Sequence, residues 1–346
     1  MGNRKVTKDV SDSIIASAVL ASFPLNKSDR ILEAHATDHV KVVVKGSNLI
    51  PLRITDSWFL IDTDTNVDTT ADIDTGAIEA GKDYCVYACD NSGTLVFKIS
   101  LATTYPSGFS AATSRKIGGF HTLCTSVGTI GGHTLTGYVA NDILPASIWD
   151  LKHRPIAEPA GMVYSDKANI WVDIYLASGT GASTASANGG TISDTRDWMD
   201  FVDDFAAVKK QLLDDQEFQI IAAGSNEETN ITGTADPVTT GGHSDTAGRR
   251  MISNIGCEDC CGVMWQWLRD QSYRPGSSSA WDWYDLPGSK GSLYSYAGLN
   301  GDADVKLLAG ASWNGGAVSG SRSRHAHSYR WYTSSSIGGR GRSEPR

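Results

Sequence analysis

The stretch that most constrains the fold is the polar segment of residues 307–342, which contains no acidic residue. It has no apolar run beyond Leu308 and is rich in Gly, Ser and Arg, a composition that usually indicates disorder. Large aromatic residues are nevertheless spread through it: Trp313, Tyr329, Trp331 and Tyr332. Aromatics placed between recurring glycines and arginines favour ordered loops that present a surface. We therefore predict that this segment is folded and binds a ligand.

Two kinds of residue are interleaved along this segment. Residues of one kind suit a scaffold, because the indole of Trp packs well and the guanidinium of Arg donates several hydrogen bonds. They are Trp313, Arg322, Arg324, Trp331 and Arg340. The other kind is small or amphipathic and comprises Ser312, Asn314, Gly315, Val318, His325, His327, Ser328, Tyr332, Ser334 and Ser336. Every residue of the second set can be encoded by an adenine-adenine-pyrimidine codon with none, one or both adenines replaced. These residue types suit an adaptable protein-binding surface, so we predict that the second set contacts a ligand and the first supports it.

The sequence from Trp313 to Gly341 resembles the variable proteins of diversity-generating retroelements. Their C-terminal segment follows the pattern W-N-N-G-A-N-x-G-S-R-x-R-N-A-N-N-Y-R-W-N-T-N-S-N-I-G-x-R-G, in which adenine-directed reverse transcription rewrites the Asn codons. The resemblance implies a C-type lectin-like fold with a hypervariable surface, and a receptor-binding role in a viral tail fibre. It also implies a homotrimer at the tail-fibre tip of a virion. The implied partners are tail-fibre proteins and a host cell-surface receptor that is itself a protein.

A Gly- and Arg-rich tail that binds RNA or an anionic surface is the alternative for this segment. Its arginines are widely spaced among aromatic and small residues, without Arg-Gly-Gly repeats. The whole chain has a formal net charge of -9, which disfavours sequence-independent binding to phosphates. We therefore expect no nucleic-acid partner.

The first residues, MGNRKVTKDV, contain no apolar core of a signal peptide. No run in the chain approaches the roughly 20 apolar residues that a membrane-spanning helix needs. We therefore expect neither signal-directed export nor membrane insertion.

Composition divides the chain into an N-terminal segment and two domains. Residues 41–148 contain short β-branched runs separated by turn residues, which predicts a β-sandwich. Among the 10 tryptophans only Trp58 precedes residue 149, and this shift marks a final domain of residues 149–346. The resemblance implies that residues 1–40 serve attachment and oligomerisation.

The final domain is predicted to be α+β, and the whole chain an α+β multi-domain protein with a β-rich N-terminal region. Residues 161–178 alternate between apolar and polar and predict a strand pair. Residues 197–213 carry apolar side chains at spacings of three and four, which predicts a helix. Residues 214–225 predict a second, shorter helix with Asp214 or Asp215 as its N-cap.

Residues 254–270, NIGCEDCCGVMWQWLRD, resemble formylglycine-generating-enzyme-like domains, a branch of the C-type lectin fold. Trp265 and Trp267 are predicted to lie on a core strand. The resemblance raises the alternative of a sulfatase-modifying enzyme, whose paired cysteines would fall between residues 313 and 340. Because this chain has no cysteine after Cys261, we predict that it is not an enzyme and has no catalytic residue. A structural virion protein without a diversified site is the third hypothesis.

Two groups of residues could suggest a metal site. Cys257, Cys260 and Cys261 are clustered, but no second Cys or His pair lies nearby at ligand spacing. We therefore predict buried, reduced cysteines. His325 and His327 would share one side of a strand, but no third ligand follows them within the segment. We accordingly predict neither a metal nor a cofactor.

Overall fold

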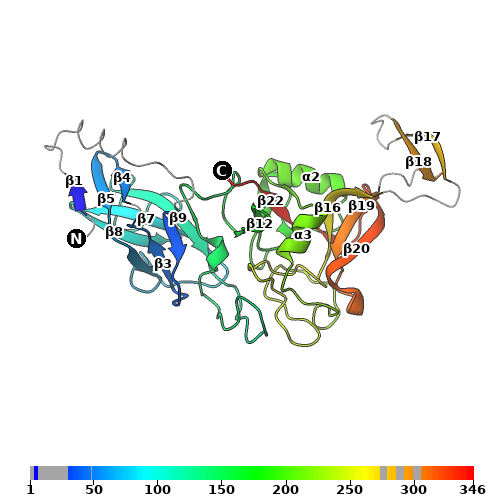
Figure 1. Cartoon of the computed structure of the whole chain (residues 1–346), viewed down its shortest axis with the longest axis horizontal. Helices are drawn as coiled ribbons and strands as arrows, with labels where there is room; N and C mark the ends of the chain where they lie inside the picture. Colours follow the sequence, from blue (N-terminus) through cyan, green and yellow to red (C-terminus); the bar gives the residue numbers. More distant parts are fainter. Residues whose placement is uncertain (1–3, 7–29, 48, 273–278, 286–291, 299–304) are drawn as a thin grey trace. The chain divides into compact units, whose positions relative to one another are not determined.

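The computed structural model describes residues 4–6, 30–47, 49–272, 279–285, 292–298 and 305–346. The chain forms two compact units (Figure 1). Unit 1 comprises residues 1–126, 137–155 and 345–346, and unit 2 comprises residues 127–136 and 156–344. Most of the predicted attachment segment, residues 1–40, lies outside the described residues.

In its described residues, unit 1 consists of antiparallel strands in three sheets. In chain order these are β1 (Arg4–Val6), β2 (Leu32–Ala34), β3 (Lys41–Val44), β4 (Ile50–Ile54), β5 (Ser57–Ile61), β6 (Thr65–Asp68), β7 (Asp83–Asn91), β8 (Thr94–Ser100), β9 (Ser114–His121) and β10 (Trp149–Asp150), with the 3-10 helix η1 (Pro145–Ser147) before β10. The sheet orders are β1-β5-β4, β2-β3-β6 and β10-β9-β7-β8. The β-rich region predicted from the sequence is confirmed.

One continuous apolar core holds unit 1 together. Strands β3 and β4 alternate between buried and more exposed residues, as strands with one face on a core do. Valines and isoleucines from all three sheets meet in this core. Asp150, which is 1% exposed, accepts hydrogen bonds from the backbone N–H groups of Ile31 and Leu32 at 2.7 and 3.1 Å. The end of β10 is thereby tied to the start of β2.

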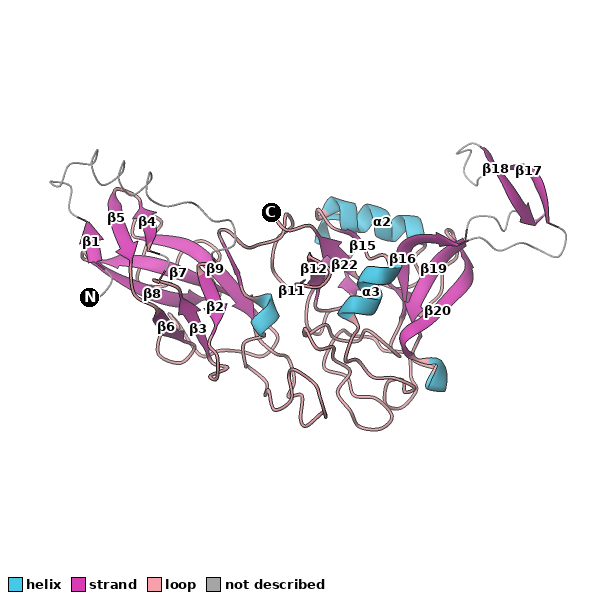
Figure 2. Cartoon of the chain, in the orientation of Figure 1, coloured by secondary structure: helices cyan, strands magenta, loops and turns pink. Residues whose placement is uncertain are grey.

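The described part of unit 2 combines short helices with two four-stranded sheets (Figure 2). Its elements are β11 (Met162–Ser165), β12 (Ile170–Asp173), β13 (Ala177–Ser178), η2 (Gly181–Ser183), β14 (Ala185–Ser186), α2 (Trp198–Ala207), β15 (Gln211–Leu212), α3 (Asp215–Ile221), β16 (Trp265–Ser272), β17 (Ser279–Asp285), β18 (Ser292–Gly298), β19 (Val305–Gly310), η4 (Gly316–Val318), β20 (Gly320–Tyr329), β21 (Ile337–Gly338) and β22 (Gly341–Ser343). The larger sheets have the orders β11-β12-β22-β15 and β20-β19-β16-β21, and β13-β14 and β17-β18 form separate pairs.

The C-terminal segment contributes to both larger sheets of unit 2. Strands β20 and β21 belong to one, and β22 lies between β12 and β15 in the other. The predicted strand pair within residues 161–178 is present as β11 and β12. Trp267 of β16 is 1% exposed, as predicted for a core strand, whereas Trp265 is only partly buried.

Both predicted helices are present, but they are shorter than predicted. Asp197 and Asp214 are their N-caps, and each accepts a hydrogen bond from the third backbone N–H of its helix. Helix α2 ends at Ala207 because Lys209 takes a left-handed backbone conformation, with φ of 61°. Lys210 is then free to bind the buried Asp173 carboxylate at 2.6 Å. Within the described part of the chain, no helix has the length and apolarity to cross a membrane.

Candidate binding surface

The predicted ligand-contacting residues lie along β20 and in the loops at its two ends. Ser312, Asn314, Gly315 and Val318 precede β20, and η4 forms part of this first loop. His325, His327 and Ser328 lie within β20, while Tyr332, Ser334 and Ser336 follow it. In the sheet, β20 is an edge strand, paired on one side with β19 (Figure 2). An edge strand and its flanking loops can vary in side chain without disturbing a central strand.

Exposure differs among these positions. Asn314, Val318 and Tyr332 are exposed, Val318 by 63% and Tyr332 by 40%. Four others are half-buried: Gly315, His325, Ser334 and Ser336. The side chain of His327 lies outside the described part of the structure.

Ser312 and Ser328 depart from the prediction of an exposed contact set, because they are only 3% and 4% exposed. Ser312 donates to the Asn314 side-chain oxygen at 2.8 Å, and Ser328 Oγ lies 3.4 Å from His325 Nδ1. Ser328 is also paired in register with Lys306 of β19. In this conformation both serines support neighbouring positions rather than present their own side chains.

Neighbouring residues of β20 face opposite sides of the sheet, as in any strand. The His325 ring lies 5.6 Å from the ring of Trp265, which is on β16. On the other side, the Arg324 guanidinium forms an ion pair with Asp215 and lies 5.2 Å from the Phe218 ring. Since both of these partners are on α3, Arg324 ties β20 to this helix. The predicted supporting role of Arg324 agrees with this geometry.

Arg340 is the most deeply placed of the predicted scaffold residues, at 1% exposure. Its guanidinium donates to the carbonyl oxygens of Asp173 and Ile174 at 2.8 and 2.6 Å. It also donates to the Gln266 side-chain oxygen at 3.0 Å and to the Glu258 carbonyl oxygen. One side chain thus joins β12, β16 and the loop before β16. Charge-assisted hydrogen bonds in a dry interior are strong, so Arg340 stabilises this group of elements. We call β12, β16 and the loop before β16 the platform beneath β20.

Of the other predicted scaffold residues, Trp313 and Trp331 pack against neighbouring side chains, whereas Arg322 is exposed. Trp313 packs against a buried apolar cluster of unit 2, and Trp331 lies 4.8 Å from the Tyr329 ring. Arg322, for which the sequence predicts the same supporting role as for Arg340, is exposed, whereas Arg340 is buried. Sequence position alone did not distinguish Arg322 from Arg340.

Trp198 supports the surface although its sequence pattern indicated only core packing. Its backbone N–H donates to the Arg330 carbonyl oxygen at 2.9 Å, and its indole N–H donates to the Leu268 carbonyl oxygen at 2.8 Å. The Lys306 ammonium and the Arg330 guanidinium lie 4.3 and 5.5 Å from its ring centroid. The start of α2 therefore holds the loop that carries Tyr332. The apolar spacing of residues 197–213 predicted this helix, but no local signal predicted which loop would dock at its start.

Known proteins resemble the chain in both sequence and fold. Residues 33–150 match the family described as the Mtd second domain. The chain is 27% identical to the tail fiber receptor-binding protein of Bordetella phage BPP-1, over 98% of this chain and 92% of the relative. The solved U1 and M1 variants of the Major Tropism Determinant each match with a TM-score of 0.74 and 26% identity, over 92% of this chain and 84% of theirs.

The chain resembles the Major Tropism Determinant along nearly its whole length. The match confirms the resemblance read from the C-terminal segment, and with it the C-type lectin-like fold predicted for the final domain. The Mtd second domain corresponds to strands of unit 1, from β2 to β10. The predicted surface lies in the part of the chain that follows this domain. Among the described residues, no three His, Cys, Asp or Glu side chains are grouped to hold a metal ion.

Proposed function

We propose that this protein is the receptor-binding protein of a viral tail fibre, and that its C-terminal segment forms a hypervariable, protein-binding surface. The observation that carries the proposal is the similarity over 98% of the chain to a tail-fibre receptor-binding protein. We further propose that a diversity-generating retroelement rewrites the codons of the second residue set. The residue types of that set, all of which substituted adenine-adenine-pyrimidine codons can encode, support this part of the proposal.

The geometry around β20 supports a division between residues that vary and residues that hold the fold. A diversified side chain cannot be relied on for core packing, so stability has to come from neighbours that do not change. Arg340 and Arg324 are such neighbours. Arg340 donates to backbone carbonyl oxygens such as that of Asp173, and Arg324 forms an ion pair with Asp215 of α3. Tyr332, by contrast, is exposed and adds large contact area at low conformational cost.

The proposed partner is a protein on the host cell surface, and the proposed assembly is a homotrimer carried by tail-fibre proteins of the virion. One small patch gives modest affinity, because association costs orientational and side-chain entropy. Three copies of the surface on one fibre would raise the overall affinity through effective concentration. Neither a catalytic step nor a cofactor enters this proposal.

A competition experiment tests the receptor-binding role. The purified full chain should block adsorption of its own phage to host cells, and Tyr332→Ala should need at least a tenfold higher concentration to do so. Val238→Ala is the matched control, because Val238 is 72% exposed in the same unit but far from the C-terminal segment in sequence. Failure of the wild-type chain to block adsorption would refute the role in host binding.

The diversification is tested separately by sequencing the DNA beyond the gene. We expect a near-copy of the last codons, with adenines at the positions of the second set, beside a reverse-transcriptase gene. If the near-copy is absent, the binding surface is not rewritten by this mechanism, whatever the adsorption result.

A further inference from the structure

Two buried cysteines lie close together in the loop that leads into β16. Cys257 and Cys260 are each 0% exposed, and both are free thiols. The Cys260 sulfur lies 3.8 Å from the Cys257 carbonyl oxygen, so this side chain points back along its own loop. Asp259, between them, has a left-handed backbone with φ of 58°, which turns the chain at this point. The two cysteines therefore lie on one tight turn, and their thiols interact with each other.

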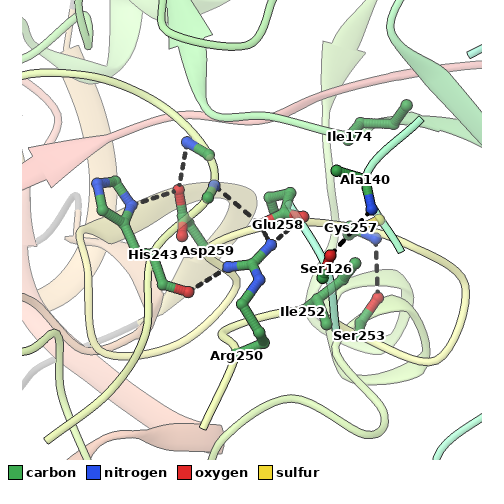
Figure 3. Close-up of polar contacts among 12 residues, drawn as sticks. Ser126, Ala140, Ile174, His243, Arg250, Ile252, Ser253, Cys257, Glu258 and Asp259 are labelled. Atoms are coloured by element: carbon green, nitrogen blue, oxygen red, sulfur yellow. Dashed lines mark hydrogen bonds and ion pairs between the residues drawn. The ribbon is translucent and has the colours of Figure 1, made fainter. Parts of the chain in front are cut away.

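Polar groups from several sides form hydrogen bonds and ion pairs with residues 257–259 of this loop (Figure 3). The Cys257 N–H donates to Ser253 Oγ at 3.1 Å, and the Glu258 carboxylate accepts from Arg250 at 2.7 and 2.8 Å. His243 Nδ1 lies 3.0 Å from the Asp259 carboxylate. These contacts fix the loop in the conformation that keeps the thiols together.

The electrostatics make the two thiols unequal. Burial raises the pKa of Cys257 well above its usual value, and its interaction with the Cys260 thiol raises it further. Burial by itself would also raise the pKa of Cys260, but the Cys257 thiol and the Arg340 guanidinium outweigh it and lower that pKa. One sulfur is thus favoured as the thiolate and the other as its protonated neighbour, which is the arrangement of a reactive dithiol.

We propose that Cys257 and Cys260 form a disulfide when the protein meets an oxidising medium, by exchange with a small disulfide such as oxidised glutathione. The Cys260 thiolate attacks one sulfur of the small disulfide and releases one glutathione thiolate. Cys257 then loses its proton and attacks the Cys260 sulfur, which releases the second glutathione. Two protein thiols are oxidised to one S–S bond, and one glutathione disulfide is reduced to two thiols. Because the pair is buried, exchange requires local opening of the loop or occurs during folding.

The proposed disulfide would stabilise the platform beneath β20. The carbonyl oxygens of Asp259 and Cys260 accept from the Gln266 side chain at 3.2 and 2.9 Å, and that of Glu258 accepts from Arg340. A covalent link across the loop restricts the unfolded chain and favours the conformation that presents these acceptors. The closed loop is short, so the expected rise in melting temperature is about 5 °C.

Counting thiols after refolding tests the proposal without depending on the receptor. The full chain is unfolded in urea with reductant and refolded in either reduced or oxidised glutathione, so that access to the buried pair does not limit the reaction. After acid quenching, thiols are blocked with N-ethylmaleimide in denaturant and counted by intact mass. All 6 thiols should be blocked from reduced buffer and two fewer from oxidised buffer, with the link mapped to one peptide that contains Cys257 and Cys260.

Two variants make the assignment specific. Cys257→Ser should form no protein disulfide in oxidised buffer and should instead keep one glutathione on Cys260, whereas Cys261→Ser should still form the link and lose two thiols. Retention of all 6 thiols by the refolded wild-type chain would overturn the proposal, and so would a link that involves Cys261 or any cysteine of unit 1.

Discussion

Replacing Arg340 with methionine tests whether a buried guanidinium supports the binding surface. Methionine has a similar length but no charge and no hydrogen-bond donor. The substitution would leave the carbonyl oxygens of Asp173, Ile174 and Glu258, and the side-chain oxygen of Gln266, without the donor they share. Each of these acceptors is in the interior of unit 2, where water cannot take the place of the guanidinium.

The magnitude follows from the number and placement of these bonds. Removing one member of a buried charged network typically costs about 3–5 kcal/mol, because its partners stay buried and unpaired. For a unit of this size, about 4 kcal/mol lowers the melting temperature by about 12 °C. Arg322→Ala is the matched control, since Arg322 is an exposed arginine of the same segment. Its melting temperature should change by less than about 2 °C.

Tryptophan fluorescence during heating is the suitable assay, because most of the tryptophans, from Trp171 to Trp331, lie in unit 2. Far-ultraviolet circular dichroism on the same samples reports the backbone structure of both units together. Equal transition temperatures for wild type and Arg340→Met would refute the view that Arg340 is a structural hub. A large fall for Arg322→Ala would show that the division between buried and exposed arginines is wrong.

Three further predictions follow from the same structure. Ser328→Tyr should destabilise unit 2 by about 1–3 kcal/mol in thermal or urea unfolding, because Ser328 is 4% exposed and a large side chain does not fit, whereas Asn314→Tyr should be neutral. Burial lowers the pKa of His243, but its hydrogen bond to Asp259 outweighs burial and raises the pKa overall. The charged histidine therefore stabilises the folded state below its unfolded pKa, and this contribution is lost as pH rises through the folded pKa. Urea unfolding across that range should show the loss in wild type and not in His243→Gln, and a stability difference that does not vary with pH would contradict the assignment. Light scattering at micromolar concentration should give three times the chain mass of 36.9 kDa, and a monomer would exclude the proposed trimer.

The sequence by itself determined those features whose physical causes are local. Asp197 and Asp214 begin the two helices because a side-chain carboxylate close in sequence can accept the first free N–H groups. Short β-branched runs indicated the strands of unit 1, and the interleaved residues of the C-terminal segment indicated both the surface and the family resemblance. None of these inferences required knowledge of a distant contact.

Only the tertiary structure decided which residues hold the surface and which face outward. Arg340 and Arg322 have the same chemistry, but Arg340 meets partners that lie 74 and 167 residues away in sequence. The burial of Ser328 and the docking of the Arg330 carbonyl on the Trp198 backbone also depend on such distant pairings. Just after α2, Lys210 likewise binds Asp173, 37 residues before it. A contact between segments far apart in the chain exists only once the fold brings them together, so no periodicity or spacing within one segment could reveal it.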